Sequence, residues 1–170
     1  KVRDTVSHHP AGASVDELDS KLEGLILPVF DFREMARRSL GKNWNSGSNE
    51  QRKEFVDLFT KLLSDTYLKR IREIEKSTVS YVGERVHGSR AVVKTVVTQE
   101  GQDFPIDYRM GKQGEVWRVY DVVIENISLV SNYRSEFAGI IRKDSFSGLL
   151  ERLRQKRAEM VASRNEGDAA

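Results

Sequence analysis

The sequence predicts an α+β fold in which helices lie before and after a curved four-stranded antiparallel sheet. Three observations support this prediction. Apolar residues recur at helical spacing before residue 77, they do so again after residue 128, and four strand-like runs lie between, joined by short glycine-containing turns. Short turns join neighbouring strands in antiparallel order, and a sheet with one apolar face needs helices to cover it.

The composition limits the chain to one domain and excludes several classes of function. Its 170 residues are 38% hydrophobic, enough for one core, and 28 basic residues nearly balance 26 acidic ones. Nucleic-acid binding needs a concentrated excess of Lys and Arg, so we do not expect it. The absence of Cys excludes disulfides and thiolate chemistry. No apolar run approaches the roughly 18 residues of a membrane span. A start at Lys1 without Met leads us to expect a processed or trimmed form.

The first part of the chain is predicted to be a leader followed by helices. Residues 1–13 lack apolar periodicity, so we expect a flexible leader. Ser14, Asp31 and Ser48 each precede an apolar pattern of helical period and are typical N-cap residues. The third of these helices is long and amphipathic and should end near Lys76.

Three histidines are weak candidates for a metal site. His8 and His9 are adjacent, and His87 lies far along the chain in a predicted hairpin turn. This spacing does not provide a tetrahedral ligand set. We therefore predict neither a metal nor a cofactor.

The four strand-like runs occupy residues 79–86, 91–98, 104–110 and 116–124. Alternation in the third run places Phe104, Ile106 and Tyr108 on one face. In the second run, an outward Lys94 leaves Val93 and its alternate neighbours facing inward.

The fourth run is apolar on both faces, which is typical of a central or covered strand. If Arg118 points outward, Trp117, Val119, Asp121 and Val123 point inward by alternation.

The last part of the chain returns to helix and carries its densest positive charge. Apolar residues repeat at helical spacing from Leu129, and a second helix should follow Ser145. The basic residues there are Arg142, Lys143, Arg152, Arg154, Lys156 and Arg157. A solvated helix face is the simpler interpretation, and docking to an acidic partner or to anionic lipid headgroups is the alternative. We expect residues 161–170 to form a flexible tail, which leaves a single domain over residues 14–160.

Several short segments resemble the MlaC family, the toluene-tolerance-type periplasmic phospholipid carriers of Gram-negative bacteria. The matching segments include LPVFDF at 27–32, LGKNW at 40–44, QRKEF at 51–55, WRVYDV at 117–122, ISLV at 127–130 and NYR at 132–134. The resemblance covers residues 15–158. Asn126 stands where the family's usual Gly precedes the Ile-Ser-Leu step, and Asn also tolerates a positive φ.

The resemblance implies an NTF2-like or cystatin-like shape whose curved sheet and helices enclose an apolar pocket. It implies a monomeric carrier, not an enzyme, that shuttles phospholipid between the outer and inner membranes through the periplasm. Such a carrier serves outer-membrane lipid asymmetry and tolerance of organic solvents. The implied partners, besides phospholipid, are an inner-membrane MCE-type ABC transporter and an outer-membrane lipoprotein complex.

We place the lipid pocket between the inner face of the sheet and the helices. An acyl chain loses about 0.8 kcal/mol per methylene on entering water, so a carrier must offer a dry wall. The headgroup should stay outside, recognised weakly or not at all, because burying an unpaired phosphate is costly. The predicted lining residues are Phe32, Phe55, Phe59, Val93, Phe104, Ile106, Tyr108, Trp117, Val119, Leu129, Tyr133 and Phe137.

Two other functions remain open at this level. A solid-cored, NTF2-like interaction module would show the same apolar periodicity. An enzyme of the ketosteroid-isomerase type would use an inward Asp121 together with Tyr81 or Tyr108. Asp121 would serve equally well as a structural acceptor for backbone amides or for Arg134.

Overall fold

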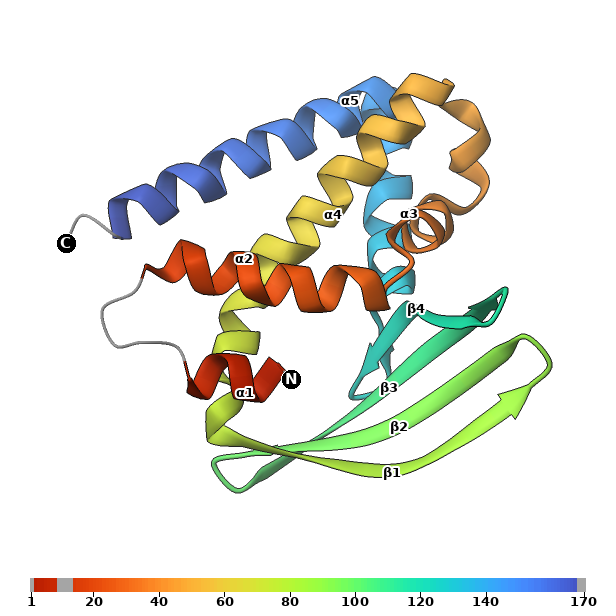
Figure 1. The fold of residues 1–170 in the computed structure, drawn as a ribbon. Helices are drawn as coiled ribbons and strands as arrows, with labels where there is room; N and C mark the ends of the chain where they lie inside the picture. Colours follow the sequence, from red (N-terminus) through yellow and green to blue (C-terminus); the bar gives the residue numbers. More distant parts are fainter. Residues whose placement is uncertain (1, 9–13, 168–170) are drawn as a thin grey trace.

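The computed structural model describes residues 2–8 and 14–167, and its helices gather on one side of a curved antiparallel sheet (Figure 1). The helices are α1 (Val2–Ser7), α2 (Val15–Ile26), α3 (Phe32–Leu40), α4 (Asn49–Arg72) and α5 (Leu129–Gly167), with 3₁₀ turns η1 (Leu27–Val29), η2 (Gly41–Ser46) and η3 (Glu73–Lys76). The strands are β1 (Ser77–His87), β2 (Arg90–Gln99), β3 (Gln102–Gln113), β4 (Val116–Ile124) and β5 (Ile127–Ser128). The predicted α+β class is confirmed.

The sheet has five strands in the order β1-β2-β3-β4-β5, so the prediction of four was wrong. The additional strand, β5, is only two residues long and pairs with the end of β4. Glu125 and Asn126 form the turn between them, with φ of 48° and 68°. Two positive φ values are the geometry of a tight hairpin turn, and a two-residue strand is too short to show any periodicity.

The predicted N-caps begin the helices as expected. The Glu17 amide donates to Ser14 Oγ at 3.2 Å, and the Glu34 amide donates to Asp31 Oδ1 at 3.0 Å. Ser48 forms a complete capping box at the start of α4. Each cap satisfies amides that the first helical turn leaves unpaired.

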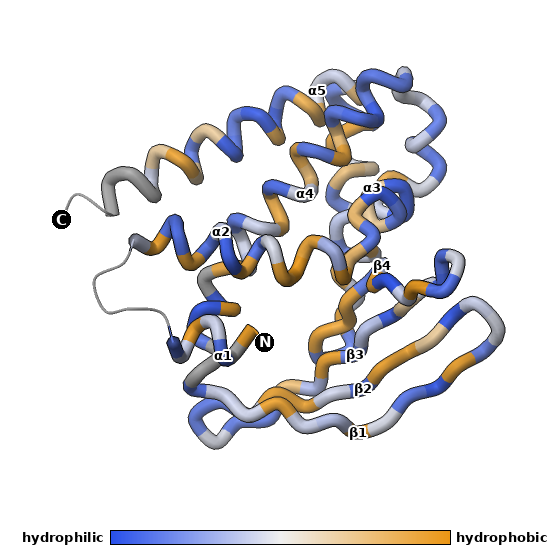
Figure 2. The backbone as a smooth tube through the Cα atoms, in the orientation of Figure 1, coloured by the Kyte–Doolittle hydropathy of each residue, from blue (hydrophilic) through white to orange (hydrophobic). Residues whose placement is uncertain are grey.

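The main core lies among α3, α4 and α5 and is built on aromatic rings. The Phe137 ring meets Phe55 edge-on at 5.4 Å between centroids and Phe59 at 5.6 Å. Hydrophobic and hydrophilic residues alternate in short blocks along α4 and α5, so each helix presents an apolar stripe to this core (Figure 2). No helix in the described part of the chain combines the length and apolarity that a membrane span requires.

A second, smaller core forms where α2 crosses α4. It contains Leu18, Leu22 and Leu68, and Val2 and Val6 of α1 pack against it. The predicted leader thus includes a helix, while residues 9–13 lie outside the described residues. At the other end, α5 continues through most of the predicted tail. The division into leader, domain and tail stays a prediction.

Helix α5 is broken at Ser145, which has φ 67° and ψ 177°. The break separates an arm over residues 129–144 from one over residues 146–167, as the sequence predicted for two consecutive helices. Phe146, directly after the break, is buried in the main core beside Phe55. The two arms run in different directions on either side of this break (Figure 1).

Candidate functional site

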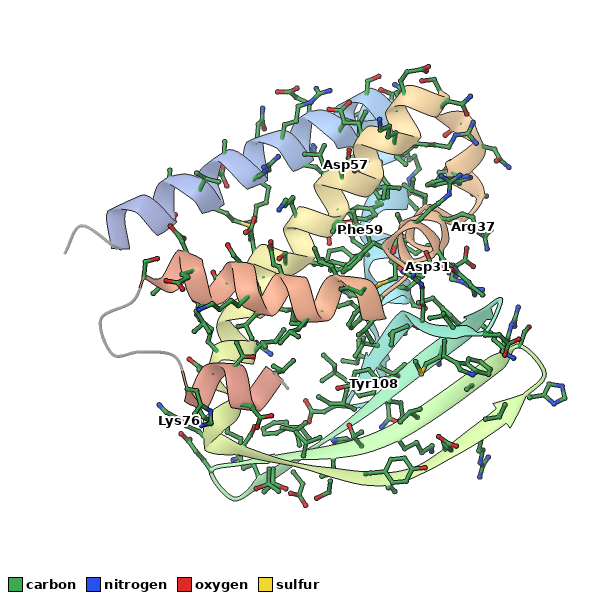
Figure 3. All side chains as sticks on the ribbon, viewed as in Figure 1. Asp31, Arg37, Asp57, Phe59, Lys76 and Tyr108 are labelled. Carbon is green, nitrogen blue, oxygen red and sulfur yellow. The ribbon has the colours of Figure 1, made fainter. Side chains whose placement is uncertain are left out.

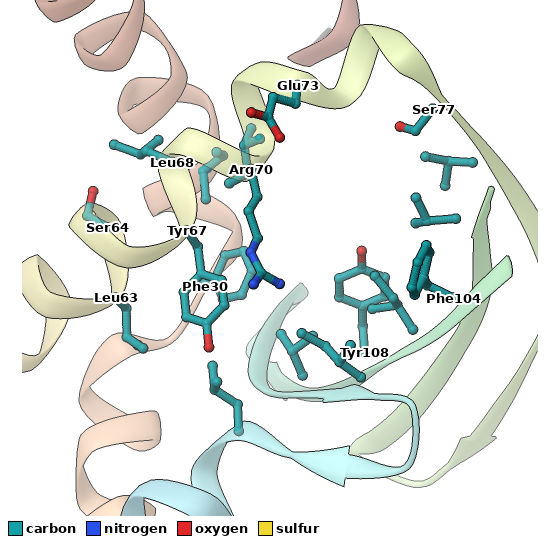
Figure 4. Close-up of a pocket in the computed structure, with 18 of the residues that line it drawn as sticks. Phe30, Leu63, Ser64, Tyr67, Leu68, Arg70, Glu73, Ser77, Phe104 and Tyr108 are labelled. Carbon is teal, nitrogen blue, oxygen red and sulfur yellow. The ribbon is translucent and has the colours of Figure 1, made fainter. Parts of the chain in front are cut away.

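A partly open hollow of about 480 Å³ lies between the sheet and helices α2, α3 and α4 (Figure 4). Its size is within the range of about 300–1,000 Å³ that is typical of small-molecule sites. The apolar and aromatic wall consists of Ile26, Phe30, Phe32, Met35, Leu63, Tyr67, Leu68, Ile71, Val79, Val97, Phe104, Ile106, Tyr108, Val122, Ile124 and Leu129. The polar side chains on the wall are Glu23, Ser64, Arg70, Glu73, Ser77, Gln99 and Glu125.

The sheet side of the hollow follows from strand register. Val97 pairs with Phe104, Tyr108 with Val122, and residues directly opposite each other share a face. Tyr108 rises from the sheet toward the helices, whereas Phe59 lies among the helices (Figure 3). The pairing thus gathers the apolar face of β2, β3 and β4 opposite the helices.

The helix side of the hollow comes chiefly from the second half of α4. Leu63, Tyr67 and Ile71 are spaced four residues apart, so they form one stripe along that helix. Phe30, before α3, completes this side and stacks on Phe32 at 5.6 Å. Phe30 and the three residues of the α4 stripe were absent from the predicted lining, although the four-residue spacing on α4 was visible in the sequence.

Five of the twelve predicted lining residues lie on the wall: Phe32, Phe104, Ile106, Tyr108 and Leu129. The remaining seven lie elsewhere. Phe55, Phe59 and Phe137 are at most 1% exposed and fill the main core, with Tyr133 packed against it. Val93, Trp117 and Val119 lie on the sheet outside the hollow, Val93 opposite Tyr108 and Val119 opposite Met110.

The prediction that Asp121 and Val123 point inward was wrong. The register between β3 and β4 shifts at Arg109 and Met110, so that Tyr120 is an extra residue on β4. A bulge of this kind reverses the alternation for every residue that follows it. Val122 and Ile124 therefore face the hollow in place of Asp121 and Val123.

Asp121 is a structural acceptor at the junction of β4, β5 and α5. The residue is 3% exposed. Its carboxylate accepts hydrogen bonds from Ser128 Oγ at 2.7 Å and from the Val130 amide at 3.1 Å. Arg109 Nη1 donates a third hydrogen bond to this carboxylate at 3.0 Å. The sequence had suggested Arg134 as this donor. Asp121 faces away from Tyr108, and Tyr81 is exposed on β1, so the carboxylate–tyrosine pair of an isomerase does not come together among the described residues.

Two tyrosines whose pKa is shifted, Tyr67 and Tyr108, line the hollow, and a third, Tyr133, packs against the main core. Burial raises the pKa of Tyr67 and of Tyr108, the latter partly offset by a hydrogen bond with Thr95. Burial, helped by Tyr67 and Glu136, raises the pKa of Tyr133 to about 12. Within the described ranges, no three His, Asp or Glu side chains gather as metal ligands, and His9 lies outside those ranges.

The six basic residues proposed for docking are exposed on both arms of α5. Arg152 pairs with Asp144 at 2.5 Å, and Arg154 pairs with Glu54 and Glu151 at 2.7 and 2.9 Å. For the other four, Arg142, Lys143, Lys156 and Arg157, the structure gives no ion pair with a described residue. Their role in docking stays a prediction.

Comparison with known proteins gives concordant matches along this chain. The Haemophilus influenzae protein named intermembrane phospholipid transport system binding protein MlaC is 22% identical over 142 residues, which are 80% of this chain and 66% of that protein. The phospholipid-binding protein from Ralstonia solanacearum, determined in complex with a phospholipid, superposes with a TM-score of 0.85 at 28% identity and covers 94% of this chain and 92% of its own. The model of the MlaC protein family matches residues 2–155. The chain therefore belongs to the MlaC family.

Proposed function

We propose that this protein is a periplasmic carrier that holds phospholipid by its acyl chains and moves it between the inner and outer membranes. The observation that carries the proposal is the apolar hollow of about 480 Å³ between the sheet and α4. The likeness to a Ralstonia protein determined with a bound phospholipid supports the class of ligand. The name of the Haemophilus relative supports the transport role.

The wall of the hollow has the chemistry that acyl chains need. Its sheet side presents Val97, Phe104 and Ile106, and its helix side presents Leu63 and Leu68. Each methylene buried against such a wall recovers about 0.8 kcal/mol. Acyl chains held against this wall keep part of the stabilisation that they have in a bilayer, as exchange with a membrane requires.

The partners of such a carrier are a lipid donor and a lipid acceptor embedded in the two membranes. By family membership we propose an inner-membrane MCE-type ABC transporter and an outer-membrane lipoprotein complex. Exchange requires short-lived docking, for which small and polar contacts are suited.

The carrier function is tested by the lipid content of the purified protein. Protein expressed in a Gram-negative host and purified without detergent should release about one phospholipid per chain on extraction with organic solvent, measured by mass spectrometry. Delipidated protein should take up phospholipid again from vesicles. A protein without an apolar hollow, purified in parallel, controls for adhering lipid. Absence of stoichiometric lipid together with failure of uptake would refute the carrier function.

A further inference from the structure

Arg70 extends from α4 into the apolar hollow (Figure 4). The charged residues on the described wall are Glu23, Arg70, Glu73 and Glu125, so Arg70 is the one cation among them. Its side chain is exposed to solvent and extends toward Tyr67 and Phe30. An exposed arginine needs no ion-pair partner while water reaches it, so a missing partner becomes costly only when a ligand covers the side chain.

The described carboxylates around the hollow do not neutralise Arg70. Glu23 accepts from Ser64 Oγ at 2.5 Å and lies 3.8 Å from Lys61. Glu73 and Glu125 are exposed, and neither forms an ion pair with Arg70. The positive charge of Arg70 acts on Tyr67. It lowers the pKa of the Tyr67 hydroxyl, while burial raises that pKa by a larger amount.

A ligand that covers Arg70 would strip water from its guanidinium, which has no ion pair with a described residue. Transferring an isolated charge to an apolar environment is so costly that such groups are found paired. A phosphodiester carries one negative charge and two free oxygens, and guanidinium binds phosphate oxygens through two parallel hydrogen bonds. A bound phospholipid can therefore supply the partner that the described side chains do not.

We propose that Arg70 binds the phosphate of the lipid whose acyl chains occupy the hollow. This inference rests on the proposed carrier function and refines it. The sequence led us to expect weak or no recognition of the headgroup, whereas here the protein binds the headgroup at its phosphate. The contact would select lipids that have a phosphodiester over lipids with the same chains and no phosphate. It would not distinguish phospholipids that differ only in the group attached to the phosphate.

The test compares two lipids that differ only in the phosphate-bearing headgroup. Delipidated protein is equilibrated with vesicles that contain dipalmitoylphosphatidylglycerol and dipalmitoylglycerol in equal amounts, and the bound lipids are quantified by mass spectrometry. The variants are Arg70→Gln, Arg70→Lys and Glu73→Gln, with Arg85→Gln as the matched control. Arg85 is an exposed cation of β1 outside the hollow, so its loss changes net charge equally.

We expect Arg70→Gln to lower the bound ratio of phospholipid to diacylglycerol on the order of tenfold, as for a lost hydrogen bond to a charged group. Arg70→Lys should keep part of the preference, and Arg85→Gln and Glu73→Gln should keep all of it. Uptake of diacylglycerol by Arg70→Gln should be unchanged, which shows that the hollow is intact. An unchanged ratio in Arg70→Gln would overturn the proposal, and so would an effect of equal size in Glu73→Gln.

Two further outcomes distinguish a bound lipid phosphate from a free anion and from an empty hollow. If excess inorganic phosphate abolishes the preference of the unmodified protein, Arg70 is a site for free anions and the assignment to lipid phosphate is overturned. If the unmodified protein takes up neither lipid, the carrier function itself fails.

Discussion

Gly47 lies directly against the ring of Phe146, at the point where the loop before α4 meets the break in α5. A β-carbon at Gly47 would lie 2.8 Å from Phe146 Cζ and 2.9 Å from Cε2. The ring is 5% exposed and packs edge-on against Phe55, so it has little room to withdraw. The backbone of Gly47 is extended, with φ −89°, so the constraint is space and not conformation.

We predict that Gly47→Ala destabilises the protein by about 1–3 kcal/mol, the usual cost of an extra group in a packed core. The matched control is Gly24→Ala on α2, where a β-carbon meets nothing within 4 Å. That change should stabilise the protein by about 0.5–1 kcal/mol, because alanine is the better helix former. Denaturant unfolding of both variants measures the two effects. Equal stabilities of the two variants would contradict the role given to the Phe146 contact.

Single residues also mark the limits of what the sequence could predict. Alternation assigned Asp121 to the inner face, and the extra residue Tyr120 reversed that assignment. A bulge leaves no signal in a strand that is apolar on both faces, because either phase looks acceptable. By contrast, the caps at Ser14, Asp31 and Ser48 were predicted correctly, since their side chains act on amides only three residues away.

At the scale of elements, α4 shows why only part of the pocket wall was predicted. The helix has 24 residues and is about 36 Å long, and its apolar stripe runs through Phe55 and Phe59 to Leu63 and Tyr67. The first half of the stripe meets α5, and only the second half lies over the sheet. Periodicity identifies the inner face of a helix but not the element opposite each turn, so core and pocket residues looked alike.

The strands allow a direct test of the hollow. Val97 of β2 lines it, while Val96 points to the opposite face of the same strand. We predict that Val97→Trp strongly reduces phospholipid uptake from vesicles with little change in the unfolding midpoint, because the indole enters open space. Val96→Trp should leave uptake intact. If Val97→Trp instead costs about 1–3 kcal/mol, the space is a packed core, and a solid-cored module becomes the better description.

At the scale of the whole molecule, the two arms of α5 spread positive charge over a wide surface. Two of the six basic residues are engaged with acidic neighbours, which leaves the four without a described ion pair as the candidates for docking. Exposed charges are screened over about 10 Å at 0.1 M salt, so a contact based on them must weaken as salt rises. The sequence showed that basic residues are concentrated in this part of the chain. It could not show which of them form ion pairs with acidic side chains.

We predict that replacing the four basic residues without a described ion pair with Gln slows lipid transfer to the proposed membrane partner and leaves lipid occupancy unchanged. The replaced residues are Arg142, Lys143, Lys156 and Arg157. The difference should be largest at low salt, because steering by exposed charge raises the association rate. Transfer to vesicles that carry the purified MCE-type protein measures the effect, with Arg85→Gln/Arg90→Gln on the β1–β2 hairpin as control. Transfer at the unmodified rate at low salt would show that these arms are merely solvated.

The partly open hollow also determines which amphiphiles the protein binds during purification. Detergent monomers combine a hydrocarbon chain with a polar head, and the wall that suits an acyl chain suits them equally. We expect detergent present during lysis to compete for the hollow in proportion to its concentration and to displace the cellular ligand. Purification without detergent is therefore needed to recover the ligand that the protein bound in the cell.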